Sequence, residues 1–560
     1  MDITKELSHI IQGCVKQAQE EFSFTVAPDI VLERPPKTDF GDLSTNAAMQ
    51  LCKINQSPKL KETADFLCRR LKDSIAGTQF SGYIKEIFVM PPAFINFRFA
   101  NKVFYDLVLN IEKEKVSFAK RNFAQGKKVI VEFVSANPTG PLTVAHARQA
   151  VVGDAISNIL EFFGWKVVRE YYLNDEGNQI NVLAASIYAR YAELAGVTFE
   201  FPQDGYKGDY VKDIAKEIFN EHKNKFKVFS EKEKEFFGQY GVSVILKDIE
   251  KDLKDIGVAF DNYTSQHKFA RTGKIEKSLK TLKDKGLIYE KEGAAWFKST
   301  EFGDDKDRVL IKSDGTYTYI TPDIAYHRDK YERGFDWLID IWGPDHHGYI
   351  PRMRAAQRAL GKKDDSLSVI IIQLATIYRG SKPVRMSTRN AEYITLREVI
   401  DEVGPDVSKF FFLTRKNSSH LDFDIELAKT ESPENPVYYI QYAHARICGI
   451  LKRSSELNKS CAAAEKVNLE LLNKNEEINL LKVLGDYPRV LQAAYETLEP
   501  YRILEYLLEL SKVFHSFYTV HKVITDDAEL TGARIVLINA VKTILSDALN
   551  LLGISIPEKM

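Results

Sequence analysis

The order of apolar and polar positions along the chain predicts an α/β core. Lys128–Val134 is rich in β-branched apolar residues, which is typical of a buried strand. A loop containing Asn137 and Gly140 follows, and apolar residues then recur at helical spacing over Val144–Leu160. A second strand is expected over Lys166–Tyr172. Strand, loop, helix and strand in this order predict a βαβ unit and therefore a parallel sheet.

Shorter apolar segments elsewhere predict further strands. Tyr83–Val89 and Phe94–Phe99 have strand-like patterns on either side of a proline pair. Trp337–Trp342 and Val369–Ala375 are apolar enough to be buried strands. The first 110 residues mix strand-like and helical stretches, which favours an α+β domain there.

Two regions have a helical pattern. Residues 205–290 are dense in Lys and Glu, which predicts a solvated helical insertion. From about residue 400, amphipathic segments such as Leu480–Leu498 and Arg502–Val520 follow one another with few glycines. The sequence therefore predicts three domains. These are an N-terminal α+β domain over residues 1–110, an α/β catalytic domain over 111–400 that includes the insertion, and a C-terminal all-α helical bundle over 401–560.

Composition narrows the class of protein. The 560 residues include 77 Lys and Arg against 78 Asp and Glu, which excludes a polybasic tail protein and an acidic disordered one. No apolar run approaches the ~18–20 residues of a membrane span. Five cysteines are scattered without a CxxC pair, which argues against a disulfide framework and a zinc site. We expect a protein of the reducing cytoplasm with no membrane partner.

The loop after the first strand is one candidate for chemistry. Parallel sheets bind ligands beyond the carboxyl ends of their strands, and the helix that begins near Thr143 points its amino terminus there. Free N–H groups and the helix dipole favour a phosphate at that point. His146, in the first turn, could hydrogen-bond the phosphate or supply positive charge. The alternative is a turn shaped by Gly140 and Pro141, with His146 only capping the helix.

A second candidate is the basic loop Gly380–Asn390. It carries Arg385, Ser387 and Arg389 after an expected buried strand. Arginine suits bidentate contact with phosphate, so these side chains could reach a triphosphate. Taken alone, such a loop is more often solvated surface.

Together the two loops resemble the signature motifs of class I aminoacyl-tRNA synthetases, which read H-I-G-H and K-M-S-K-S. The match is to arginyl-tRNA synthetases in particular, and it covers essentially the whole chain. The stretches that carry it are VEFVSANPTGPLTVAH (131–146), YYLNDEGNQI (171–180), WGPDHHGYIPRMRAA (342–356), MSTRNAEYITLREVIDEVG (386–404) and DFDIELAKTESPENPVYYIQYAHARI (422–447). The ending LNLLGISIPEKM is also similar to that family's carboxyl terminus.

The chain departs from the family pattern in both motifs. Thr143 and Ala145 stand where the first motif has a histidine and a glycine. Thr143 keeps a hydroxyl donor, whereas the methyl of Ala145 faces the surface on which the family's adenine packs. In the second motif Arg385 and Arg389 keep the cations, and Thr388 loses one.

The resemblance implies a Rossmann-type catalytic domain and a role for individual residues. The residues expected to act in catalysis are His146, Arg385, Ser387 and Arg389. The residues expected to bind ATP are Pro138, Gly140, Thr143, Ala145, His146, His346 and Met386. The residues expected to bind arginine are Glu132, Ser135, Asn137, Tyr319, Asp323 and Asp345. Those expected to bind tRNA are Tyr438, Tyr442, Arg446 and Met560.

Recognition of arginine has its own chemical logic. Its planar cation cannot be deprotonated, so a pocket for it needs fixed acceptors. Tyr319 and Asp323 are four residues apart and could share a helical face. A lysine ammonium could not satisfy such a forked set of acceptors. The alternative is that Asp323, which follows Pro322, only caps a helix.

The aromatic run in the C-terminal region permits two interpretations. Tyr438, Tyr439 and Tyr442 could stack on splayed RNA bases, with Arg446 near a phosphate. An aromatic stripe at helical spacing is more often core, and we favour core packing for Tyr439 and Tyr442. The region has 18 Lys and Arg against 23 Asp and Glu, which disfavours generic affinity for nucleic acid and remains compatible with local, shape-specific contact.

The resemblance implies an arginine–tRNA ligase. ATP, as its Mg²⁺ complex, would activate arginine to arginyl-adenylate, and the 3′ end of tRNA would then accept the arginyl group. It further implies a monomer, a first step that needs bound tRNA, and no tightly bound metal or organic cofactor. Two alternatives remain at this point. One is a nucleotidyl transferase of the same fold that never meets RNA, and the other is a noncatalytic tRNA-binding relative.

Overall fold

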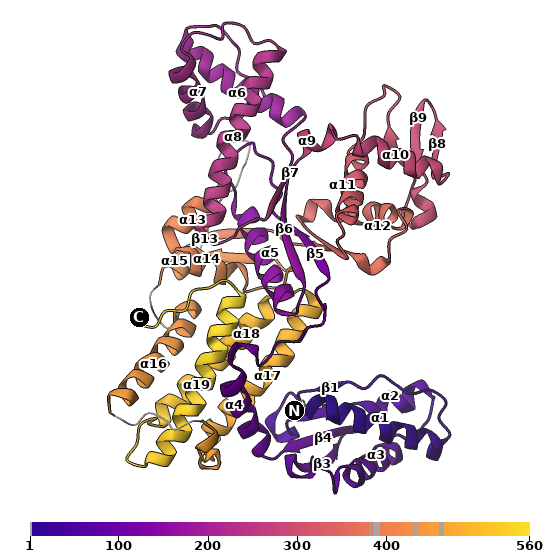
Figure 1. The fold of residues 1–560 in the computed structure, drawn as a ribbon, viewed down its shortest axis with the longest axis vertical. Helices are drawn as coiled ribbons and strands as arrows, with labels where there is room; N and C mark the ends of the chain where they lie inside the picture. The colour runs from indigo at the N-terminus through magenta and orange to yellow at the C-terminus, as the bar shows by residue number, and fades with distance from the viewer. Residues whose placement is uncertain (1–2, 381, 385–392, 431, 433, 458–463) are drawn as a thin grey trace. The chain divides into compact units, whose positions relative to one another are not determined.

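The computed structural model describes residues 3–380, 382–384, 393–430, 432, 434–457 and 464–560. The chain divides into two compact units. The first comprises residues 1–118, 450–485 and 513–541, and the second comprises 119–449, 486–512 and 542–560. Figure 1 traces the elements of both in chain order.

The first unit contains a four-stranded antiparallel sheet in the order β1-β2-β4-β3. Helices α1 and α3 pack on it, and Leu7, Leu67, Ile95 and Phe97 lie in the shared apolar core. The predicted strand Phe94–Phe99 is confirmed. The elements are α1 (Ile3–Phe22), β1 (Leu32–Glu33), β2 (Leu43–Thr45), α2 (Ala47–Ile54), α3 (Leu60–Ile75), β3 (Ile84–Met90), β4 (Phe94–Phe99) and α4 (Lys102–Glu114).

The second unit is built on a five-stranded parallel sheet in the order β12-β11-β5-β6-β7. The predicted βαβ unit is confirmed, with helix α5 between the neighbouring strands β5 and β6. The predicted strand at Trp337–Trp342 is β11, which lies beside β5. The elements are β5 (Lys128–Glu132), α5 (Val144–Phe162), β6 (Lys166–Leu173), β7 (Asn262–Ser265), β11 (Trp337–Trp342) and β12 (Leu367–Ile371).

A helical insertion follows β6. It consists of α6 (Asn178–Ala195), α7 (Asp209–His222) and α8 (Glu231–Asp255), which pack on one another as Figure 1 shows. Aromatic residues such as Tyr188, Tyr191 and Phe237 fill its centre. The expected helical interval to residue 290 is wrong at β7, which joins the main sheet, and at the strand Ile288–Lys291, whereas Gln266–Ala270 and Lys274–Asp284 are helical as expected. The sequence of β7, Asn-Tyr-Thr-Ser, is polar because β7 is an edge strand.

Between β7 and β12 the chain forms a second lobe around an antiparallel sheet in the order β10-β9-β8. Leu282, Phe297, Leu310 and Ile324 lie in its apolar core. Helix α11 connects this lobe to β11 and carries several candidate site residues. The elements are α9 (Gln266–Ala270), α10 (Lys274–Asp284), β8 (Ile288–Lys291), β9 (Ala294–Phe297), β10 (Arg308–Ile311), α11 (Ile320–Glu332) and α12 (Ile350–Ala359).

The remaining residues are mainly helical. The expectation of helix from residue 400 to the end is wrong at β15, a short strand that pairs with β13. The smaller elements are β13 (Ala375–Arg379), β14 (Lys382–Pro383), α13 (Leu396–Val403), α14 (Pro405–Phe412), β15 (Leu421–Asp424) and α15 (Ile425–Ala428). The long helices are α16 (Pro436–Glu456), α17 (Asn475–Thr497), α18 (Tyr501–Val520) and α19 (Ala528–Leu551).

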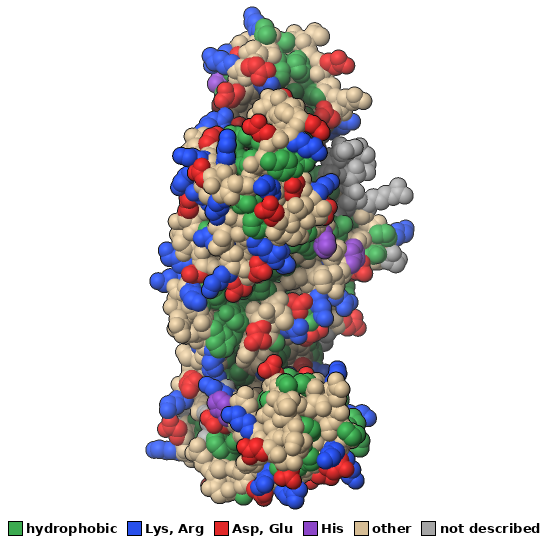
Figure 2. Space-filling view, turned by 90° about the vertical axis from the view of Figure 1, so that its right-hand side faces the viewer, with side chains coloured by type: hydrophobic (Ala, Val, Ile, Leu, Met, Phe, Trp, Pro, Cys, Tyr) green, Lys and Arg blue, Asp and Glu red, His purple; other side chains and the backbone are tan. Residues whose placement is uncertain are grey.

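The surface mixes charges of both signs. Figure 2 shows Lys and Arg side chains interspersed with Asp and Glu, in keeping with a formal net charge of −1. Within the described ranges, no helix is both long and apolar enough to cross a membrane. Cys14, Cys52, Cys68 and Cys448 carry free thiols.

Candidate active site

Three carboxylates lie side by side on adjacent strands of the parallel sheet. Glu132 ends β5 and is in register with Glu170 of β6 on one side and with Asp340 of β11 on the other. All three side chains are buried. Burying three acids in one row is unfavourable unless cations accompany them, so the charges around this row define the site.

Helix α11 supplies the charges that face two of these acids. Lys330 is fully buried, and its Nζ lies 2.5 Å from Glu132 Oε2 and 2.8 Å from Asp340 Oδ1. His327 Nε2 lies 2.7 Å from the other oxygen of Asp340, which holds the histidine pKa above its usual value despite burial. Lys330 and His327 hold the pKa of Asp340 well below its usual range, also against burial. Burial dominates at Glu132 and raises its pKa.

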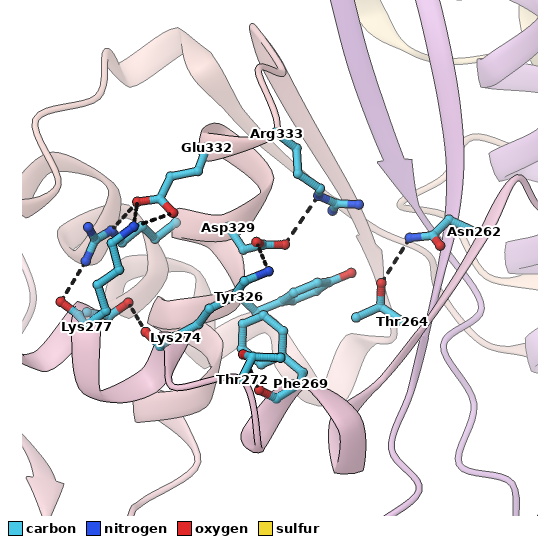
Figure 3. A network of polar contacts seen from close by, with 12 residues as sticks. Asn262, Thr264, Phe269, Thr272, Lys274, Lys277, Tyr326, Asp329, Glu332 and Arg333 are labelled. Carbon is cyan, nitrogen blue, oxygen red and sulfur yellow. Dashed lines mark hydrogen bonds and ion pairs between the residues drawn. The ribbon is translucent and has the colours of Figure 1, made fainter.

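The third acid, Glu170, has its own partners. Arg333 donates two hydrogen bonds to it, at 2.7 and 2.8 Å, and the Tyr326 phenol donates another. Figure 3 shows Tyr326 near Arg333, with the Asp329 carboxylate between Arg333 and Lys274. The acids of the strand row are therefore paired with cations from α11.

Asp323 differs from the acids of the row. It lies in the first turn of α11, and its Oδ2 accepts a 2.5 Å hydrogen bond from the phenol of Tyr349. In the described part of the chain, no Lys or Arg side chain forms a salt bridge with it. Burial therefore raises the pKa of Asp323. A half-buried acid whose partner is a neutral phenol can accept a cation from a ligand.

Tyr319 is placed differently from Asp323. It is the residue before α11, and 87% of its surface is exposed. The structure does not bring its phenol to the half-buried Asp323 carboxylate, so a joint guanidinium pocket stays a prediction. Asp345 and His346 are both exposed in the short turn after β11, and Asp345 Oδ2 lies 3.3 Å from His346 Nε2.

The turn after β5 has an unusual backbone. Val134 and Ser135 both have positive φ, at 66° and 39°, which is uncommon for residues with side chains and recurs at functional sites. Ser135 Oγ accepts the backbone N–H of Tyr172 at 3.0 Å and donates to Glu132 Oε1 at 3.2 Å. Asn137 Nδ2 donates to Gln179 Oε1 at 2.7 Å. These contacts link Ser135 to Glu132 and to β6, and Asn137 to the start of α6.

The predicted helix start at Thr143 is confirmed as a cap. His146 Nδ1 accepts the Thr143 backbone N–H at 3.2 Å and lies 3.3 Å from the Thr143 hydroxyl. Burial lowers the pKa of His146 to about 4, so the imidazole is neutral at pH 7. The capping interpretation and a phosphate contact are compatible, because the capping bond uses Nδ1 only. Pro138, Gly140 and Ala145 complete the same loop and first helical turn.

Residues 385–390 of the second predicted loop lie outside the described residues. That applies to Arg385, Met386, Ser387 and Arg389. The segment after it is described: Leu396 donates its backbone N–H to Leu142 O at 2.8 Å, and Thr395 forms an isolated bridge with Thr143. The chain that follows the second loop therefore contacts the first loop directly.

The predicted tRNA-binding residues lie on α16 and at the chain end. Tyr442 is 39% exposed, so its expected core position is wrong, whereas Tyr439 is half-buried. The Arg446 guanidinium lies over the Tyr442 ring, 4.4 Å from its centroid. Tyr438 is half-buried in the first turn of the helix, and Met560 is exposed.

Sequence reasoning missed several side chains of the site. Lys330 and His327 follow Asp323 by seven and four residues, so helical spacing already placed them on one face. Arg333 follows Lys330 by three residues, so the same spacing applies to it, whereas Tyr349 offered no comparable signal because only the packed fold brings it to Asp323. No group of three or more potential metal ligands occurs among the described side chains.

Three protein-family models together match most of the chain. Residues 108–420 match the model of the class I tRNA synthetase (R) catalytic domain. Residues 4–99 match the arginyl tRNA synthetase N-terminal domain, and residues 440–560 match the DALR anticodon-binding domain.

Individual relatives are similar to this chain along nearly their whole length. The chain is 45% identical over 552 residues to an arginine–tRNA ligase of Citrifermentans bemidjiense, covering 98% of each protein. It is 44% identical over 566 residues to that of Anoxybacillus flavithermus, covering 100% of each. The fold matches the arginyl-tRNA synthetase structure of Thermus thermophilus with a TM-score of 0.76 at 20% identity, covering 99% of this chain and 100% of that one.

Proposed function

The chain belongs to the arginyl-tRNA synthetase family of class I enzymes, and on that premise we propose which of its residues carry the reaction. It is an arginine–tRNA ligase, which joins L-arginine to tRNA with conversion of ATP to AMP and diphosphate. The proposal concerns the arginine pocket, the ATP loops, the RNA-contacting residues and the state of the protein in the cell.

The main support for the proposal is Asp323, which forms no salt bridge with any described Lys or Arg side chain. Its half-buried carboxylate hydrogen-bonds Tyr349, while neighbouring buried acids pair with Lys330 or Arg333. A bound arginine would supply the missing cation, and its planar guanidinium donates the paired hydrogen bonds that a carboxylate accepts. In this proposal Asp323 holds the guanidinium, with Tyr319 closing over it from the helix start.

The amino-acid end of arginine is assigned to the turn after β5. Glu132, Ser135 and Asn137 are held together there at the carboxyl end of a central parallel strand. Carboxylate and amide oxygens are suitable acceptors for an α-ammonium group. The substrate would then lie with its guanidinium toward α11 and its carboxylate toward the amino terminus of α5. Asp345 is assigned to the rim of the same pocket.

ATP is assigned to the loop from Pro138 to His146. The reaction is in-line attack of the arginine carboxylate on the α-phosphorus, which forms arginyl-adenylate and releases diphosphate. The helix amino terminus favours the developing negative charge. Neutral His146, whose Nδ1 is used in capping, offers Nε2–H to a phosphate oxygen. Gly140, Thr143, Ala145 and His346 would line the nucleoside side.

The second signature loop is assigned to the leaving diphosphate. Arg385, Ser387 and Arg389 would contact its oxygens, and Met386 would contact the nucleoside. Mg²⁺ would arrive as part of the ATP substrate complex and share the phosphate charge. Catalysis is then positioning plus electrostatics, with no protein nucleophile.

The remaining assignments concern RNA and cellular state. Tyr442 is partly exposed and stacks on Arg446, which suits contact with an unstacked RNA base. By the family resemblance, Tyr438 and Met560 are also assigned to RNA contact. We assign residues 1–110 to the tRNA body, 111–400 to catalysis and 401–560 to the anticodon region. We further propose a cytoplasmic monomer.

The experiment that tests the proposal is arginine-dependent ATP–diphosphate exchange, with and without tRNA. Lysine tests the forked geometry of the pocket, and citrulline keeps the shape of arginine without its charge. The proposal predicts exchange with arginine only, dependent on tRNA and abolished by EDTA. Equal exchange with citrulline would show that Asp323 is not matched by the ligand's charge.

A further inference from the structure

The helical insertion reaches the first signature loop through a tyrosine. Tyr210, the second residue of α7, donates a 2.6 Å hydrogen bond from its phenol to the backbone carbonyl of Thr139. Thr139 precedes Gly140 in the loop assigned to ATP. A Cβ on Gly140 would lie 3.1 Å from the phenol oxygen of Tyr210, so the missing side chain lets the phenol approach the backbone.

Two further contacts tie the insertion to the same region. Gln179, at the start of α6, accepts the hydrogen bond from Asn137 of the loop. At the end of α8, Asp252 and Asp255 pair with Arg397 at 3.0 and 2.5 Å. Arg397 lies in α13, directly after the backbone contacts to the first loop.

A second phenol stands beside the first. The oxygen of Tyr393 lies 3.6 Å from the same Cβ position on Gly140, and Tyr393 follows the second signature motif in the chain. Gly140 is therefore flanked by Tyr210 from the insertion and Tyr393 from the chain after the second loop. The insertion therefore contacts the first loop and, through Arg397, the helix that follows the second loop.

We infer that Tyr210 is a positioning residue, through which the insertion α6–α8 sets the backbone of the ATP loop for adenylate formation. The carbonyl of Thr139 is fixed by the phenol, and the next residues lead into the α5 amino terminus. A loop without that bond would spend more time away from the geometry that in-line attack requires. This inference rests on the proposed assignment of the loop to ATP.

The test is Tyr210→Phe, which removes one oxygen and keeps the ring. Tyr240→Phe is the control, because Tyr240 also donates a phenol hydrogen bond within the insertion, at 3.3 Å to the Glu221 carboxylate and not to the loop. Losing one hydrogen bond of about 0.5–1.5 kcal/mol should lower kcat/KM for ATP about two- to thirteenfold. The KM for arginine and the melting temperature should stay at wild-type values, which separates positioning from a merely structural role.

A double-mutant cycle with Gly140→Ala tests the contact itself. The added methyl should slow exchange in the wild-type background, and less so with Tyr210→Phe, because the phenol oxygen that it meets is gone. Losses that simply multiply across the cycle, or equal rates for Tyr210→Phe, Tyr240→Phe and wild type, would overturn the inference. If wild type itself gave no arginine-dependent exchange, the proposed function would fail first.

Discussion

Asp323 and Tyr349 form a half-buried acid–phenol pair at the centre of the proposed arginine pocket. Tyr349 comes from the turn after β11 and Asp323 from the start of α11, and their oxygens are 2.5 Å apart. The phenol gives the carboxylate one hydrogen bond but no countercharge. Because the neighbouring acids of the strand row already pair with cations, Asp323 is the acid whose charge a cationic substrate would balance.

Replacing Asp323 with Asn should therefore remove discrimination by charge. The amide keeps the size of the side chain and a hydrogen-bonding oxygen but loses the negative charge. We expect kcat/KM for arginine to fall by an amount that corresponds to about 2–5 kcal/mol of activation free energy, because the substrate cation would lose its charged partner. Exchange kinetics with arginine and citrulline measure this. Unchanged preference for arginine in the variant would remove Asp323 from the pocket.

Arginine binding should strengthen as pH rises through the pKa of Asp323. Burial raises that pKa above its usual value, and only the charged carboxylate attracts the guanidinium. The affinity should be weak below this pKa and level off above it. Calorimetric titration of arginine across the acidic range is the measurement, with Asp323→Asn as control. The control should lack the rise, and an identical rise in both proteins would assign it to another group.

Replacing Lys330 with Met should destabilise the fold. Lys330 is the common partner of Glu132 and Asp340, and its removal leaves two adjacent buried acids without their cation. We expect a loss of about 3–5 kcal/mol in the free energy of unfolding. Urea unfolding at neutral pH measures it. Because the variant would protonate one acid as the pH falls, the deficit should shrink in mild acid, and a deficit that grows there would argue against this cause.

Replacing His146 with Ala should slow activation more than it weakens arginine binding. His146 is assigned to the phosphate and not to the guanidinium pocket. We expect kcat for exchange to fall about tenfold to a thousandfold, the range for removal of a transition-state hydrogen bond, with little change in the KM for arginine. Since the pKa of His146 is about 4, wild-type rates should show no step near pH 6.5 from this group. Normal turnover in the variant would contradict the assignment.

The sequence predicted the elements in which local pattern and environment agree. β5 and α5 could be predicted because a β-branched run is followed by apolar residues at helical spacing, and both elements are buried. β7 and β15 were missed, since Asn262–Ser265 and Leu421–Asp424 are short and partly polar.

The site shows the same division between local and long-range information. Glu132, Ser135 and Asn137 lie in one continuous turn, so a motif captured them together. Tyr349 and Tyr210 meet Asp323 and Thr139 from 26 and 71 residues away, and only the packed fold brings these pairs together. Tyr442 was expected in the core because helical spacing alone does not tell which face of α16 is covered.

A crystal structure of the protein with bound arginine tests the central claim most directly. The account predicts that guanidinium nitrogens lie within about 2.7–3.2 Å of the Asp323 carboxylate, with the Tyr349 hydrogen bond to that carboxylate retained. It would be contradicted by an arginine bound elsewhere in the cleft while Asp323 keeps Tyr349 as its partner and meets no cation.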